Sequence, residues 1–356
     1  MRDVMVYSGI VTKIRAMRSR LLKTEDYHKL AESQTVTDVI AYLKGTRAYS
    51  KLLDEMDVSL YHRGNIEKML VRSLYDDYTR LYRFSNQQQR QFLKLILNRY
   101  EVDVINHCLR IVFNHYEMTF DLDHKKDFFD KYSDISIEKI TGSNNVEELV
   151  EHLKGTEYYG PLSRVRDAGA TELLDYDLAL NLYYYSQMWK QGRKVLSKAD
   201  LEVYTRNLGT EIDLLNLQWI YRAKKYYNML APDLYAMLIP IQYRLSKAQF
   251  KALVEAPSLE EFFRILNDGT SYGRKYTFNE KDNVEAIVNH HLEYLYMTAY
   301  RKKPYSMASL VSYLFMKEKE IKIITTVLEC VRYGLPPAKT LQYVKQYEKA
   351  AGGQTA

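Results

Sequence analysis

Residues that break helices are scarce in this sequence. Only 14 of the 356 residues are glycine and 7 are proline, the two residues least favoured in the interior of a helix. Their scarcity argues against turn-rich β architectures and favours long helices. Because 46 % of the residues are hydrophobic, the chain can bury large cores. We therefore predict an all-α fold.

Cysteines and long apolar runs are also scarce. The two cysteines, Cys108 and Cys330, lie far apart and form no disulfide framework, which indicates a reducing compartment. The apolar run at residues 4–11 is too short to span a bilayer, and Lys13 and Arg15 follow it directly. We expect a cytoplasmic chain that reaches a membrane only through a partner.

Motifs that carry catalysis or hold ligands are absent from the sequence. The eight histidines show no metal-ligand spacing, and the adjacent His290 and His291 point to different sides of a helix. The Gly-Thr pairs at 45–46 and 155–156 lack the Gly-Lys-Ser/Thr sequence of a phosphate-binding loop. The net charge of +6 is not gathered into a basic stripe with a nucleic-acid reader motif. We predict no catalytic, cofactor-binding or metal-binding residues and no nucleic-acid partner.

A helix-forming motif occurs three times along the chain. Residues 35–46 (TVTDVIAYLKGT) match residues 145–156 (NVEELVEHLKGT), and residues 258–270 (SLEEFFRILNDGT) match both if one residue is inserted. Each copy begins with a residue typical of a helix N-cap and has an acid three positions later. The caps are Thr35, Asn145 and Ser258, and the acids are Asp38, Glu148 and Glu261. The recurrence predicts an internal triplication.

A second motif, which contains paired acids, also occurs three times. The pairs are Glu101 and Asp103, Glu211 and Asp213, and Glu318 and Glu320. Such a pair could serve as a catalytic acid and base. However, residues two apart on a helix point in different directions, so that one pair cannot converge on a substrate. We favour a structural role, as caps or as salt bridges between helices.

These repeats divide the chain into three predicted helical domains. The domains are residues 1–120, 121–232 and 233–349, and residues 350–356 form a tail that we expect to be frayed. Prolines cluster at the predicted seams, as Pro232 and Pro240 do before the third copy.

Three segments resemble the C-subunit family of V/A-type ATPases, whose eukaryotic member is called the d subunit. They are residues 8–22 (SGIVTKIRAMRSRLL), residues 100–106 (YEVDVIN) and residues 317–324 (KEKEIKII), the last followed by Gly334-Leu335-Pro336. Each motif alone is weakly specific, but their order and spacing cover nearly the whole chain. Ile323 stands where the first two copies have an asparagine.

The resemblance implies three similar helical domains around a pseudo-threefold axis, forming a funnel. Its base would sit on the cytoplasmic loops of the membrane rotor ring, and its mouth would receive the central axle. The protein would then be a non-catalytic central-stalk rotor subunit that transmits torque between ATP turnover and proton or sodium transport. Its partners would be the ring and axle subunits, and it would lie on the cytoplasmic face of the membrane. The alternatives are a generic helical scaffold that binds peptide or protein partners, and a helical enzyme with unrecognised catalytic residues.

The loops that follow the first repeated helix are candidate partner-binding sites, because they project at corresponding places in each copy. The candidates are Thr46 and Tyr49, Thr156 and Tyr159, and Thr270 and Tyr272. Residues at such positions more often finish a helix than bind a partner.

Overall fold

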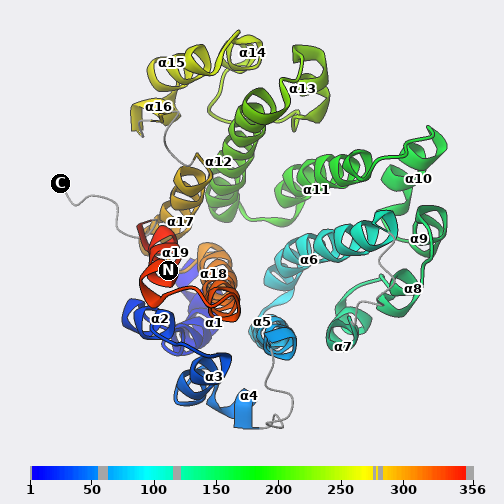
Figure 1. The fold of residues 1–356 in the computed structure, drawn as a ribbon. Coiled ribbons are helices and arrows are strands. Elements are labelled where there is room, and N and C mark those ends of the chain that lie inside the picture. The colour runs from blue at the N-terminus through cyan, green and yellow to red at the C-terminus, as the bar shows by residue number, and fades with distance from the viewer. Residues whose placement is uncertain (1, 55–62, 115–121, 276–277, 280–283, 350–356) are drawn as a thin grey trace.

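The computed structural model describes residues 2–54, 63–114, 122–275, 278–279 and 284–349. Within these ranges helix is the only regular structure (Figure 1), which confirms the predicted all-α class. The expected frayed tail and the predicted boundary at residue 120 lie outside the described residues.

Long helices occupy the middle of the molecule. They are α5 (Arg63–Phe84), α6 (Gln87–Phe113), α11 (Leu173–Val195), α12 (Lys198–Arg222), α17 (Val284–Lys302) and α18 (Ala308–Arg332). Helix α6 lies along α11, α12 along α17, and α18 along α5 (Figure 1). The N-cap of α6 is Asn86, whose side chain accepts the amide of Gln89 at 2.9 Å, and the helix continues without glycine or proline. Such uninterrupted helices are what the scarcity of helix breakers predicts.

Short helices lie at the periphery in three groups (Figure 1). The groups are α2 (Thr24–Ala31), α3 (Val36–Lys44) and α4 (Ser50–Asp54); α7 (Asp123–Tyr132), α8 (Ile137–Thr141), α9 (Val146–His152) and α10 (Tyr159–Asp167); and α13 (Ala231–Met237), α14 (Lys247–Glu255), α15 (Leu259–Gly269) and α16 (Ser271–Lys275).

The predicted N-caps start a helix in each group. Thr35 accepts the Asp38 amide at 3.1 Å, Asn145 accepts the Glu148 amide at 2.8 Å, and Ser258 accepts the Glu261 amide at 3.1 Å. In the first copy the Asp38 carboxylate also accepts the Thr35 amide, which completes a capping box. The three predicted helix starts are confirmed.

The two ends of the chain pack against each other. Helix α1 (Arg2–Arg18) lies against α5 and α18, and α19 (Pro337–Lys349) lies between α2 and α18 (Figure 1). One core cluster joins Leu30, Leu43 and Tyr49 near the N-terminus to Leu328 and Val344 near the C-terminus. This cluster spans the first and third predicted domains, so the first group of short helices is completed by the last long helix. The domain boundaries, the triplication and the funnel shape remain predictions.

Candidate functional site: buried carboxylates and a central pocket

A buried tyrosine ties each group of short helices to a long helix. Tyr49 Oη donates to Glu320 Oε1 at 2.6 Å, and Tyr158 Oη donates to Glu101 Oε2 at 2.6 Å. Tyr272 Oη donates to Asp213 Oδ2 at 2.8 Å. The three tyrosines and the three carboxylates are all buried. We call these three contacts the tyrosine–carboxylate ties.

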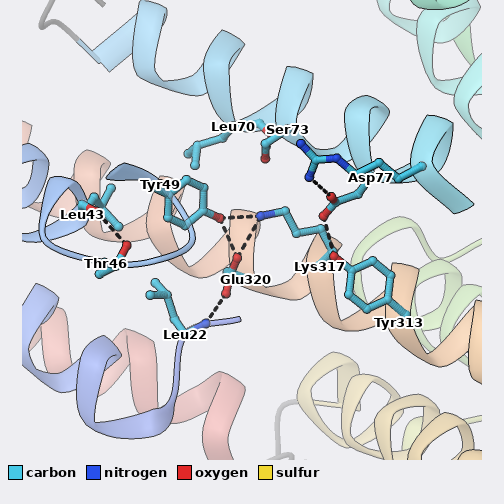
Figure 2. Close-up of polar contacts among 11 residues, drawn as sticks. Leu22, Leu43, Thr46, Tyr49, Leu70, Ser73, Asp77, Tyr313, Lys317 and Glu320 are labelled. Atoms are coloured by element: carbon cyan, nitrogen blue, oxygen red, sulfur yellow. Dashed lines mark hydrogen bonds and ion pairs between the residues drawn. The ribbon is translucent and has the colours of Figure 1, made fainter. Parts of the chain in front are cut away.

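The tie at Glu320 contains a buried ion pair. Lys317 Nζ lies 3.0 Å from Glu320 Oε1, donates to Tyr49 Oη at 2.8 Å and stands 4.4 Å from the centre of the Tyr49 ring (Figure 2). The backbone amide of Leu22 donates to Glu320 Oε2 at 2.5 Å. Lys317 is 4 % exposed and Glu320 is 1 % exposed. Both charges are therefore removed from water and depend on each other for compensation.

The other two ties hold their carboxylates with neutral donors. Glu101 also accepts the hydroxyl of Ser133, and Asp213 accepts the backbone amides of Tyr243 at 3.1 Å and Arg244 at 2.7 Å. Burial raises the pKa of both Glu101 and Asp213, and these hydrogen bonds oppose the rise because they stabilise the charged form.

The hydrogen bonds change how the repeated acids correspond. In sequence, Glu101 aligns with Glu211 and Glu318. By hydrogen-bond role it corresponds instead to Asp213 and Glu320, the second acids of their pairs. Its own second acid, Asp103, is exposed. The residues two positions before the three tie carboxylates are Arg99, Glu211 and Glu318.

These three preceding residues come together at a central pocket. Arg99 Nη2 lies 3.0 Å from Glu318 Oε2, and Tyr100 Oη donates to Glu318 at 2.9 Å. Tyr296 Oη donates to Glu211 at 2.5 Å. The pocket has a volume of about 70 Å³ and is lined by residues of α6, α11, α12, α17 and α18. Arg99 and Tyr296 are not among the residues expected from the sequence, although Arg99 directly precedes the segment at residues 100–106.

Burial raises the pKa of Glu211, and the Arg99 guanidinium opposes the rise. Between pH 4.5, the ordinary pKa of a glutamate, and the raised pKa, the folded protein therefore keeps a proton on Glu211 that the unfolded chain has lost. The stabilisation that follows is present below pH 4.5 and is lost as the pH rises through the raised pKa. We expect the Glu211→Gln variant to gain stability relative to the unmodified protein as the pH rises from about 4.5 towards neutrality. Denaturant melts of both proteins across this range measure the difference, and a difference that shrinks as the pH rises would contradict the prediction.

The candidate partner-binding residues mostly complete their own helices. Thr46, Thr156 and Thr270 each donate a hydroxyl hydrogen bond to a backbone carbonyl of the preceding helical turn, at 2.7, 2.7 and 2.6 Å. Tyr49, Thr270 and Tyr272 are buried, whereas Thr46, Thr156 and Tyr159 are partly exposed. The buried tyrosine of the second group is Tyr158 rather than its neighbour Tyr159. Partner binding at the six residues remains a prediction.

Metal ligands and membrane spans are the remaining features that bear on function. Among the described residues, no three His, Cys, Asp or Glu side chains gather as metal ligands. No helix in the described ranges combines the length and the apolar character needed to cross a bilayer. Cys108 and Cys330 are both buried and free.

Comparison with known proteins gives the family. Residues 10–343 match the model of the ATP synthase (C/AC39) subunit family. The chain belongs to this family. The C/AC39 subunit is an accessory subunit of an ATP synthase and not a catalytic one, and the resemblance to the C subunit of V/A-type ATPases is confirmed.

Archaeal relatives match this C/AC39 subunit over most of both lengths. The C subunit of the A-type ATP synthase of Thermococcus kodakarensis is 25 % identical over 348 residues, which cover 95 % of this chain and 90 % of the relative. That of Methanobrevibacter smithii is 24 % identical, with 96 % and 88 % covered. That of Methanocaldococcus jannaschii is 23 % identical, with 92 % and 83 % covered.

Proposed function

We propose that this C/AC39 protein connects the membrane rotor ring to the central axle of a rotary ATPase and transmits torque between them. The observation that carries the proposal is the family match over residues 10–343, together with relatives named as the C subunit of an A-type ATP synthase. In this role the protein lies on the cytoplasmic face of the membrane and is held there through the ring.

The internal contacts suit a part that must carry a load. Torque through a connector tends to slide its helices past each other. The tyrosine–carboxylate ties join short helices to long ones through buried, directional bonds. Packing of α2 and α19 against α18 also joins the first residues of the chain to the last. Such contacts resist shear better than apolar packing alone, because a hydrogen bond weakens steeply when its atoms are displaced.

Purification from native membranes tests the proposal. The protein is given an affinity tag in its host, and the proteins that copurify after mild detergent extraction are identified. Ring and axle subunits are expected together, and cells lacking the protein are expected to hydrolyse ATP without pumping ions. Recovery with unrelated peptides or proteins alone would favour a generic scaffold, and a reaction catalysed by the pure chain would favour an enzyme.

The partly exposed loop residues are proposed ring contacts within this function. Replacing Tyr159 with glutamate places a charge at the first residue of α10, where the loop of the second group ends, while leaving the buried Tyr158 in place. Ring binding and stability are then measured on the same protein. Loss of ring binding without loss of stability supports docking at this loop, and binding that falls only with stability assigns the loop to scaffolding.

A further inference from the structure

One side chain of the central pocket has no partner. Asn207 lies on α12, one turn before Glu211, and is only 4 % exposed. Neither its Nδ2 nor its Oδ1 atom has a hydrogen-bond partner among the described residues. Both Asn207 and Glu211 line the pocket. A buried amide without partners destabilises a fold, so its presence at a pocket indicates that something else satisfies it.

The charges of the pocket favour a cation. Its lining carries one cation, Arg99, and two anions, Glu211 and Glu318. Arg99 forms its ion pair with Glu318 and acts on Glu211 only through its charge, while the hydrogen bonds of Glu211 come from tyrosine hydroxyls. The single cation therefore leaves one negative charge of the lining without a matching positive charge. An anion entering the pocket would meet two carboxylates, whereas a cation would compensate Glu211.

The aromatic lining favours an organic cation over a bare ion. Tyr184, Tyr296 and Phe315 line the pocket, and the rings of Tyr296 and Phe315 lie 4.9 Å apart. Phe92 and Tyr204 complete the aromatic part of the wall. Aromatic faces attract ammonium and guanidinium groups and also pack against their aliphatic stems. The pocket volume of about 70 Å³ accommodates a head group of this size together with water.

We propose that the central pocket binds an alkylammonium or alkylguanidinium group, with the Glu211 carboxylate as its counter-ion and Asn207 Oδ1 accepting one of its N–H groups. Two sources share this chemistry, namely the side chain of a lysine or arginine of a partner protein and a free polyamine. The proposal does not depend on the rotor role, because it rests on the lining of the pocket in this chain alone.

Titration of the purified full chain with n-butylammonium tests the site. Binding is followed by calorimetry at constant ionic strength, with n-butanol as the neutral analogue and ammonium chloride as the free ion. Saturable binding is expected for n-butylammonium, with much weaker binding of the other two. No saturable binding, or equal binding of n-butanol, would overturn the proposal and leave a pocket filled by water.

Variants assign the contacts. Glu211→Gln is expected to weaken binding by about tenfold or more, the usual contribution of a hydrogen bond to a charged group. Asn207→Leu is expected to weaken binding without lowering the melting temperature, because it replaces an unpartnered amide with an apolar side chain of similar size. The matched control is Glu202→Gln, which changes an exposed acid of the same helix and is expected to bind like the unmodified protein.

Each pocket variant tests one contact. Unchanged binding in Glu211→Gln would overturn the role of Glu211 as counter-ion, and unchanged binding in Asn207→Leu would overturn the role of Asn207 as acceptor. If Glu211→Gln does not fold, the Asn207→Leu variant still tests the site. Spermidine and Nα-acetyl-lysine N-methylamide, which keeps a free ε-ammonium group, then distinguish the sources, because the tighter ligand identifies a free polyamine or a protein side chain.

Discussion

Replacing Lys317 with methionine is expected to lower the free energy of unfolding by about 3–5 kcal/mol, the usual cost of leaving one charge of a buried ion pair uncompensated. Methionine keeps the apolar stem of the lysine but removes the cation that lies 3.0 Å from Glu320. The Glu320 carboxylate would then remain buried, with the Tyr49 hydroxyl and the Leu22 amide as its donors. Denaturant unfolding at neutral pH measures the loss.

Two controls separate charge from packing in this experiment. The double variant Lys317→Met with Glu320→Gln is expected to recover part of the loss, because no charge is then buried. Lys303→Met removes an exposed ion pair with Glu202 and is expected to change stability by less than about 1 kcal/mol. If Lys317→Met were as stable as the unmodified protein, the buried pair would not be a stabilising contact.

Replacing Tyr158 with phenylalanine is expected to cost about 1.5–3 kcal/mol, the usual contribution of a hydrogen bond to a charged group. The ring stays in place, but the Glu101 carboxylate loses the donor that lies 2.6 Å away. The neighbouring Tyr159 is a matched control, since its hydroxyl donates to the exposed Glu151. The Tyr159→Phe variant is expected to stay within about 0.5 kcal/mol of the unmodified protein.

The same substitution can be made in the other two ties. Tyr49→Phe and Tyr272→Phe remove the corresponding hydroxyls from Glu320 and Asp213. Losses of similar size at all three positions would establish the ties as equivalent stabilising contacts. A larger loss for Tyr159→Phe than for Tyr158→Phe would contradict the assignment made from burial.

The helices and their starts could be predicted because their signals are local. The cap at Thr35 and its acid at Asp38 are three residues apart, and the scarcity of glycine and proline acts on every turn of a helix. The repeated motifs also contain three of the six acids that are buried among the described residues, namely Glu101, Asp213 and Glu320, whereas Asp77, Asp200 and Glu293 lie outside them. Structural features that depend only on residues within one or two helical turns of each other could therefore be predicted from the sequence.

The partners of the acids could not be predicted because they come from distant parts of the chain. Glu320 meets the hydroxyl of a tyrosine 271 residues earlier. Which acid of a pair turns inwards depends on how each helix is rotated about its axis, and a shift of two residues moves a side chain to another face. For this reason the alignment of the repeats paired Glu101 with Glu211, although Asp213 has the same role.

The central pocket illustrates the same limit. Arg99, Glu211 and Tyr296 come from three long helices, and neither Arg99 nor Tyr296 belongs to an aligned acid pair. Their convergence becomes visible only once the helices are placed around a common centre. The unpartnered Asn207 likewise carries no signal in the sequence, because its environment distinguishes it and not its neighbours along the chain.

The packing of the first short helices against α18 also sets an order of events during synthesis. Helices α2 to α4 emerge from the ribosome well before α18 and α19 exist. About 290 residues separate Asp54 from Val344. At ordinary elongation rates the ribosome needs roughly 15–60 s to synthesise them. Throughout this time Leu30 and Leu43 lack the part of their apolar cover that α18 and α19 supply in the finished protein. The newly made N-terminal segment is therefore the part of the chain most exposed to aggregation, and chaperones that bind apolar segments should recognise it first.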